Sequence, residues 1–209
     1  MLRYLHTKDL HAYPKLHRSM FKDRAAQFRT RLGWDVHVNE RGEEQDAYDA
    51  LNPLYVIWEN RDGSHGGSLR FLPTTGPTMA KDHFLDLTDG RPVESPRIWE
   101  CTRFCLGAGG GSRVSAALLL GGAEVGLGFG LSHALGVFDA RMVRIYRRLG
   151  WGPIILGARG TGAGAISVGL WKFSRKTRAR LLLKAGLSEE LSRHWFQRSF
   201  GRQAALQAI

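Results

Sequence analysis

Three charged residues stand inside runs that otherwise have the composition of buried strands. Arg70 lies in the run 68–72, and Glu100 and Arg103 lie in the run 99–104. A charged side chain is buried in such a strand only if an opposite charge or hydrogen bonds satisfy it. Further residues upstream can complete such a group: Arg24, Phe28, Trp34, Asp46 and Asp49. We therefore predict a paired cluster of arginines and carboxylates that can hold a charged substrate or take up a proton. A rim of ordinary surface salt bridges is the alternative that these residues leave open.

Metal chemistry and covalent catalysis have little support. His6, His11 and His17 have a spacing seen in zinc ligands, but Cys101 and Cys105 follow them, the reverse of the zinc-finger order. The sequence has neither H-E-x-x-H nor G-x-S-x-G, and no strong Cys–His nucleophile pattern. We expect scattered surface histidines, reduced cysteines, no metal and no cofactor.

Two glycine-rich segments are candidates for phosphate sites. The segment 107–111 follows a predicted strand and leads into a predicted helix, so its backbone N–H groups can cradle a phosphate. A tight turn without a ligand is an equally good interpretation. The segment 157–164 superficially matches a dinucleotide-binding fingerprint, but a strand follows it, so we predict a hairpin loop there.

Hydrophobic periodicity and turn residues predict alternating strands and helices. The expected strands are 2–5, 54–59, 67–72, 98–106, 136–139, 153–156 and 165–173, and Asp62-Gly63 marks a hairpin between the second and third. The expected helices are 13–31, 113–134, 140–149 and a basic helical extension over 174–209, with loops over 35–52 and 73–97. Strands first, then alternating helix and strand, indicate one α/β domain around a mixed sheet, covering residues 1–209.

Charge and composition restrict the possible partners. The chain of 209 residues has 30 Lys and Arg against 19 Asp and Glu, a formal net charge of +11, which attracts polyanions. The N-terminus lacks the apolar core of a signal peptide, and Glu124 and His133 interrupt the most apolar stretch. We expect a cytoplasmic protein with no membrane span.

Five separated blocks of the chain resemble the acyl-homoserine lactone synthases, the autoinducer synthases of bacterial quorum sensing. The matching residues span roughly 1–172: Arg24-x3-Phe28-x5-Trp34, Glu44-x-Asp46-x-Tyr48-Asp49, Arg70-Phe71-Leu72-Pro73 with Pro77-x-Met79, Glu100-x-x-Arg103-Phe104, and Arg147-Arg148-Leu149-Gly150-Trp151. Residue type, order and spacing all agree. The segment after Ser174 carries no motif of that family.

The resemblance implies a single-domain fold similar to the GNAT-type N-acetyltransferases, with a mixed, V-shaped sheet flanked by helices. It also implies a set of site residues. Glu100 is expected to be the general base, with Arg103 and Asp46 as further catalytic residues. S-adenosylmethionine is expected to be bound by Arg24, Phe28, Trp34, Asp46, Asp49, Arg70, Met79 and Phe84. The acyl thioester is expected to contact Thr102, Phe104, Gly136, Val137 and Met142, with Leu118, Leu131 and Ile145 as further candidates for the lining of the acyl tail.

The implied reaction is acyl transfer to the amine of S-adenosylmethionine, a substrate here and not a cofactor, followed by lactone formation with release of methylthioadenosine. The acyl donor is expected to be acyl carrier protein, which is acidic, or acyl-CoA. Charge alone suggests Arg113, Arg144, Arg147 and Arg148 as a docking surface. In this family the strand containing Gly136 sets tolerance of a C3 substituent, and a residue without a hydroxyl there favours an unsubstituted chain.

Two alternatives remain at this level. One is another acyl-CoA-dependent N-acyltransferase on the same fold, which has no need for the cluster from Arg24 to Arg70. The other is a basic module that binds nucleic acid through exposed basic and aromatic residues such as Trp171, Phe173, Trp195 and Phe196. That alternative leaves the paired Arg, Asp and Glu set unexplained, and we expect no nucleic-acid partner.

Overall fold

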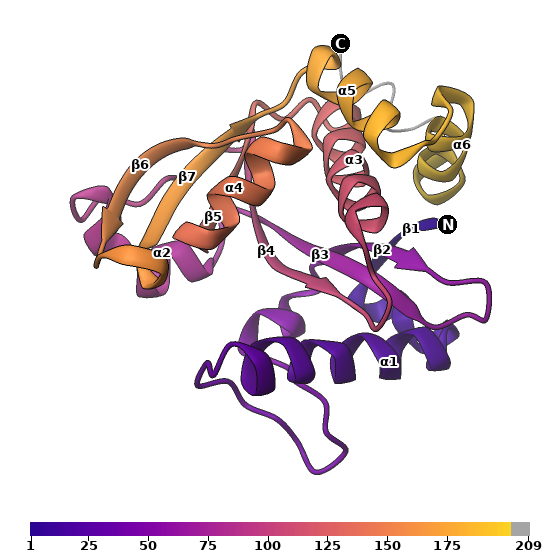
Figure 1. Cartoon of the computed structure of the whole chain (residues 1–209), viewed down its shortest axis with the longest axis horizontal. Coiled ribbons are helices and arrows are strands. Elements are labelled where there is room, and N and C mark those ends of the chain that lie inside the picture. The colour runs from indigo at the N-terminus through magenta and orange to yellow at the C-terminus, as the bar shows by residue number, and fades with distance from the viewer. Residues whose placement is uncertain (202–209) are drawn as a thin grey trace.

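Seven strands form one mixed sheet in the computed structural model, which describes residues 1–201 (Figure 1). They are β1 (Leu2–His6), β2 (Leu54–Glu59), β3 (His65–Pro73), β4 (Ile98–Leu106), β5 (His133–Asp139), β6 (Ile154–Arg159) and β7 (Ile166–Lys172). Their order across the sheet is β1-β2-β3-β4-β5-β7-β6. All neighbours are antiparallel except β4 and β5, which are parallel. The predicted mixed sheet and the hairpin between β2 and β3 are therefore confirmed.

The sheet opens into a V between β4 and β5. These two strands pair only over Ile98–Glu100 and His133–Leu135, and then they diverge. Arg103 lies just beyond this point and has a φ of 52°, a left-handed backbone conformation that non-glycine residues seldom adopt. The backbone of β4 after Glu100 has no β5 partner, so the gap between the two strands connects the space on one face of the sheet with the space on the other.

Helices cover both faces of the sheet. Helix α1 (Pro14–Ala25) lies on one face, while α3 (Ser112–Gly128), α5 (Arg175–Ala185) and α6 (Glu189–Phe200) lie on the other (Figure 1). Helix α4 (Ala140–Leu149) packs on β5 beside α3. Shorter elements are η1 (Thr7–Ala12), the π turn η2 (Ala26–Arg31), η3 (Ala47–Leu51), α2 (Met79–His83), η4 (Leu85–Thr88) and η5 (Gly162–Gly164).

Alternation along the strands decides which residues meet each helix layer. Val56 on β2 belongs to the main core with α3, whereas Tyr55 packs with the residues of α1. On β3, Phe71 belongs to the main core, and Arg70 is paired across the hairpin with Tyr55. The same alternation that buries Phe71 under α3 therefore directs Arg70 to the α1 face.

The sequence located most of these elements but not all boundaries. The predicted helix 113–134 ends at Gly128, because Gly130 takes a left-handed φ of 65°, and the following apolar residues form β5. The predicted loop 73–97 contains α2 and η4, and the predicted loop 35–52 contains η3. Strand β6 extends to Arg159, beyond its predicted end at 156.

Helices α5 and α6 confirm the helical prediction for the basic C-terminal segment as far as Phe200, while residues 202–209 lie outside the described part of the chain. A buried group joins these helices to α3. Glu124 accepts hydrogen bonds from Arg178 Nε at 2.9 and 3.0 Å and from the Ser192 hydroxyl at 2.5 Å.

Within residues 1–201, none of the helices has the length and apolarity needed to cross a membrane.

Candidate active site

A buried cluster of arginines and carboxylates occupies the α1 face of the sheet, below the gap between β4 and β5. Arg24, from α1, is completely buried; its Nε donates to Glu44 at 2.6 Å, and its Nη2 donates to Asp49 at 2.9 Å. Arg70, from β3, is equally buried and donates to Asp49 at 2.7 Å and to Asp46 at 2.9 Å. The prediction that charges inside these strands are buried in pairs holds for Arg70.

Arg103 connects this cluster to the space above it. Its Nη2 lies 2.9 Å from a carboxylate oxygen of Glu44 and 2.7 Å from one of Asp46. Its Nε is buried and has no hydrogen-bond partner in the described chain. With three arginines and three carboxylates the formal charges of the cluster cancel, while the Nε–H of Arg103 has no acceptor among the described residues.

Local structure explains how the carboxylates are held. Asp46 is the N-cap of η3: its side chain accepts the N–H groups of Tyr48 and Asp49, and the Asp49 side chain accepts the N–H of Asp46. This reciprocal capping box holds both side chains through the backbone, in addition to their contacts with the arginines. Burial by itself raises the pKa of Asp49, but Arg24 and Arg70 outweigh this effect and hold that pKa well below its usual range.

A cavity of about 320 Å³ opens through the gap of the V. Its outer part is lined by aromatic residues, by Met79 and by two polar residues: Phe28, Trp34, Met79, Thr102, Arg103 and Phe104. Its inner part is lined by apolar residues of β5, α3 and α4, among them Gly136, Val137, Leu119, Met142 and Ile145. The cavity thus joins a polar compartment above the ion cluster to an apolar one between α3 and α4.

Phe28 is the centre of a three-layer stack at the outer part of the cavity. Trp34 lies parallel to it, with ring centroids 5.2 Å apart and an interplanar angle of 18°. The Arg103 guanidinium carbon lies 5.2 Å from the centroid of the same ring. Phe28 is buried, whereas Trp34 is 39% exposed. Phe28 therefore positions its two neighbours, and Trp34 offers its remaining surface to a ligand.

Glu100 is almost completely buried, and it lies close to the cavity without lining it. Its two carboxylate oxygens accept the backbone N–H groups of Met79 at 3.0 Å and Ala80 at 2.6 Å, at the start of α2. Met79 lines the cavity, but Glu100 is not among the lining residues. Burial raises the pKa of Glu100, and the two backbone hydrogen bonds oppose the rise only in part. The carboxylate thus fixes Met79 and keeps a higher proton affinity than an exposed glutamate.

The predicted acyl-contacting residues all line the cavity: Thr102, Phe104, Gly136, Val137 and Met142. Ile145 does so as well. Leu118 and Leu131 do not; both are buried in the main core. Cys101 also lines the cavity, and burial raises the pKa of its thiol to about 12, so it is no nucleophile.

Two further predicted residues do not line the cavity. Phe84 does not reach the cavity, because it packs against the apolar cluster under β5 and β7, and the Arg159 guanidinium lies over its ring. Arg113 is exposed, and its guanidinium donates to the backbone carbonyls of Ala185 and Gly186 at the end of α5, so its part in docking stays a prediction.

Sequence reasoning did not assign a role to two residues of the ion cluster. Glu44 accepts from both Arg24 and Arg103, and Tyr55 donates its hydroxyl to Asp49. Tyr55 could have been found by counting the hairpin register back from Asp62-Gly63, which sets it opposite Arg70. Tyr48, on η3, donates to Asp82 at 2.8 Å and thereby ties η3 to α2.

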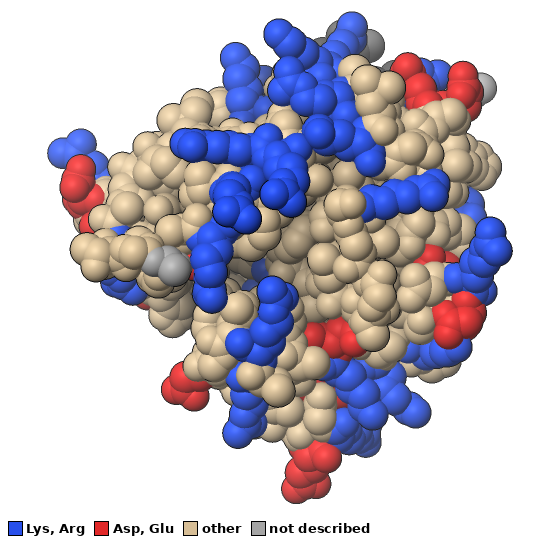
Figure 2. Space-filling model, in the orientation of Figure 1, with Lys and Arg blue, Asp and Glu red and all other residues tan. Residues whose placement is uncertain are grey.

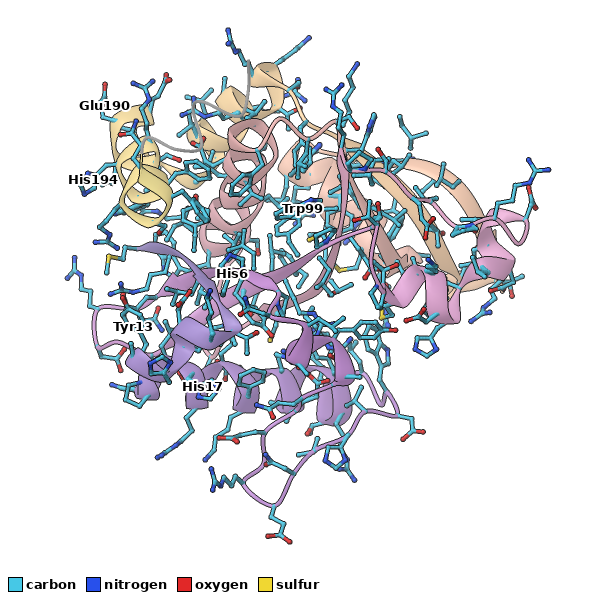
Figure 3. The ribbon with its side chains drawn as sticks, turned by 180° about the vertical axis from the view of Figure 1, so that it is seen from behind. His6, Tyr13, His17, Trp99, Glu190 and His194 are labelled. Carbon is cyan, nitrogen blue, oxygen red and sulfur yellow. The ribbon has the colours of Figure 1, made fainter. Side chains whose placement is uncertain are left out.

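The histidines do not form a metal site. His6 ends β1 and His17 lies on α1 (Figure 3); His6 contacts the Asn52 carbonyl, and His17 packs edge-on against Phe21. In residues 1–201 no group of three or more His, Cys, Asp or Glu side chains is arranged to hold a metal ion.

Known proteins resemble this chain over most of its length. A sequence model described as autoinducer synthase matches residues 8–175. An acyl-homoserine-lactone synthase of Rhizobium etli is 45% identical over 180 residues, which cover 82% of this chain and 84% of the relative. The solved structure of MesI, a CoA-dependent acyl-homoserine lactone synthase, superposes with a TM-score of 0.79 at 25% identity, covering 90% of this chain and 96% of MesI. BjaI, solved with SAM and isopentyl-CoA, superposes with a TM-score of 0.80 at 21% identity, covering 90% of each chain.

Proposed function

The chain belongs to the autoinducer synthase family, and on that premise we propose that its two-compartment cavity joins S-adenosylmethionine to an acyl thioester. The enzyme is an acyltransferase, an acyl-homoserine-lactone synthase, and its fold is the GNAT-like α/β fold of such synthases. The residue roles described below are our proposals.

The observation that carries these roles is the shape of the cavity. A single space joins a polar compartment, closed by Trp34 and Arg103, to an apolar compartment between α3 and α4. S-adenosylmethionine is a charged amino acid with an aromatic base, and a fatty acyl chain is apolar, so the two compartments match the two substrates. The junction lies beside β4, where the reacting amine and thioester have to meet.

Arg103 is proposed to bind the carboxylate of S-adenosylmethionine. Its buried Nε–H has no partner in the described chain, and leaving such a donor unsatisfied costs roughly 1–3 kcal/mol. A substrate carboxylate at this position removes that cost. Asp46, also part of the cluster, is suited to the substrate's ammonium group. Arg24, Asp49 and Arg70 lie deeper and serve to hold these two side chains in place.

Glu100 is proposed to be the base that frees the amine. The α-amine of S-adenosylmethionine is mostly protonated near neutral pH, and only the free amine attacks a thioester. Because Glu100 lies behind Met79, the proton reaches it through one water molecule. The amine nitrogen then bonds to the thioester carbonyl carbon, the carbon–sulfur bond breaks, and the thiol leaves with a proton. Backbone N–H groups of β4 beyond Glu100, which lack a β5 partner, are proposed to stabilise the oxyanion.

Lactone formation requires little from the protein beyond a correct conformation. The substrate carboxylate oxygen bonds to its own γ-carbon, the bond from that carbon to the sulfonium breaks, and methylthioadenosine leaves. The sulfonium is a good leaving group, so positioning supplies most of the rate enhancement. Trp34, with its exposed surface, is proposed to hold the adenosyl and sulfonium parts by stacking and by cation–π attraction.

The acyl donor is proposed to dock on the exposed basic surface of α4, which we define as Arg144, Arg147 and Arg148. Figure 2 shows Lys and Arg side chains gathered over α4 and α5, and residues of α4 also line the cavity. Such a surface suits the phosphates of coenzyme A and an acidic acyl carrier protein alike. MesI is described as CoA-dependent, which favours acyl-CoA as the first donor to test. The two cysteines are free, in keeping with a cytoplasmic reaction.

The proposal is tested with purified protein, S-adenosylmethionine and a set of acyl-CoA and acyl-carrier-protein donors. Methylthioadenosine and acyl-homoserine lactone are expected in equal amounts, with S-adenosylmethionine consumed at the same rate. An N-acylated product that forms without methylthioadenosine would assign the chain to the alternative class of N-acyltransferases.

A further inference from the structure

Several aromatic side chains line the apolar part of the cavity, and Trp171 of β7 is held among them by contacts on several sides. Its ring lies 5.1 Å from that of Phe138 and 5.0 Å from that of Tyr146, centroid to centroid, in both cases edge to face. Its Nε1–H donates to the backbone carbonyl of Trp151 at 3.1 Å. The indole lines the cavity, is only 6% exposed, and has contacts on two sides and at its nitrogen. A ligand therefore cannot rotate the indole aside without breaking these ring contacts and the hydrogen bond.

Gly136 provides the space in which the Trp171 ring lies. A Cβ atom at Gly136 would be 3.0 Å from Cζ3 of Trp171 and 3.3 Å from the Cys101 carbonyl oxygen. The backbone at Gly136 does not have a positive φ, so its conformation does not require glycine. Glycine is needed at this position only because a larger side chain would not have enough space. Gly136 and Trp171 thus form a coupled pair on the wall of the apolar compartment.

We propose that Trp171, seated over Gly136, is the end wall of the acyl compartment and sets the upper limit on the acyl chain length that the enzyme accepts. This inference rests on the proposed function. An acyl chain one methylene too long has to displace a packed indole, and overfilling a well-packed site is unfavourable. One methylene in an apolar pocket changes relative rates by roughly 10–200-fold, so a fixed wall gives a sharp limit.

The test compares product profiles across a series of acyl donors that differ by two carbons, each assayed with S-adenosylmethionine by liquid chromatography and mass spectrometry. In Trp171→Leu, the donor two carbons longer than the wild-type optimum is expected to gain about tenfold in kcat/KM relative to that optimum. Trp171→Phe, which keeps a ring between Phe138 and Tyr146, is expected to shift in the same direction by less.

Trp195→Leu is the matched control. Trp195 is a buried tryptophan of α6 that packs against Trp58 and does not line the cavity, so its loss loosens the core without opening the compartment. Its chain-length profile is expected to equal that of the wild type. An unchanged profile in the folded Trp171 variants would overturn the inference; if Trp171→Leu does not fold, Trp171→Phe alone decides.

Coupling between the two residues gives a second readout. Gly136→Ala is expected to press on the indole and to reduce the turnover of the longest accepted donor about tenfold. In the Trp171→Leu background the same substitution is expected to have little effect. Equal effects in both backgrounds would contradict the coupling. A wild-type protein that makes no lactone from any donor would instead refute the proposed function.

Discussion

Asp49 is the carboxylate on which the buried ion cluster depends most, and Asp49→Asn tests that dependence. Its side chain accepts hydrogen bonds from Arg24, Arg70, the Tyr55 hydroxyl and the Asp46 backbone. Asparagine has nearly the same shape, but it removes a negative charge and turns an N–H₂ group toward arginine donors. Two completely buried arginines then share too few carboxylates.

Removing one partner of a buried ion pair costs roughly 3–5 kcal/mol, because the remaining charge stays buried without compensation. For a chain of this size that corresponds to a fall in Tm of about 10 °C. Urea unfolding at pH 7, monitored by tryptophan fluorescence, measures the loss. Asp62→Asn is the matched control, since Asp62 pairs with Lys15 on the surface with both side chains mostly exposed; its unfolding midpoint should not move. A loss below about 1 kcal/mol for Asp49→Asn would refute the reasoning.

The sign of the pH dependence gives an independent check on Asp49. Its pKa in the folded protein lies well below the value of about 3.9 for an unfolded aspartate. The charged form therefore stabilises the fold at pH values above about 4, and this contribution is lost as the pH falls through the folded pKa. The stability difference between wild type and Asp49→Asn should shrink as the pH falls below about 4. A difference that stays constant with pH would mean that the charge of Asp49 does not matter.

Three predictions concern activity. Trp34→Ala should raise the KM for S-adenosylmethionine about fivefold with kcat little changed, since stacking is worth roughly 1 kcal/mol; an unchanged KM would remove Trp34 from the binding site. Glu100→Gln should lower kcat by roughly 10²–10⁴-fold. In the wild type, kcat/KM should fall with decreasing pH at a pKa above the ordinary glutamate value of about 4.3, because burial raises the pKa of Glu100. This fall in kcat/KM at low pH should be absent in Glu100→Gln. Full turnover in the variant would exclude Glu100 as the base. Replacing Arg147 and Arg148 by Glu should raise the KM for a carrier-protein donor and abolish the steep dependence of turnover on salt concentration. The KM for S-adenosylmethionine serves as the control and should not change. If wild-type turnover does not depend on salt concentration, docking at these residues is refuted.

Much of the fold could be predicted because the strands follow simple patterns. The Asp62-Gly63 turn fixed the hairpin, and the helix 140–149 has the predicted bounds. The boundary between α3 and β5 could not be predicted. The run around Leu131 is apolar except for Ser132 and His133, and periodicity does not separate a buried helix from a buried strand in a segment with so few polar residues.

The site shows a similar division between local and tertiary information. Charges at 70 and 103, set in apolar strands, indicated a paired cluster because an unpaired buried charge is so costly, but they left a rim of surface salt bridges as an open alternative. The partners Glu44 and Tyr55 depend on register and on the path of a loop, and such information is tertiary. Trp171 is indistinguishable from an ordinary core tryptophan until its place over Gly136 is known.

The most direct test of the central claim is mass spectrometry of organic extracts from cells that express this chain, scanning for the protonated homoserine lactone fragment. A series of N-acyl-homoserine lactones absent from cells with empty vector is predicted, with its length limited as the wall at Trp171 requires. Expression of folded protein without any lactone, even when unusual acyl-CoAs are supplied, would contradict the account.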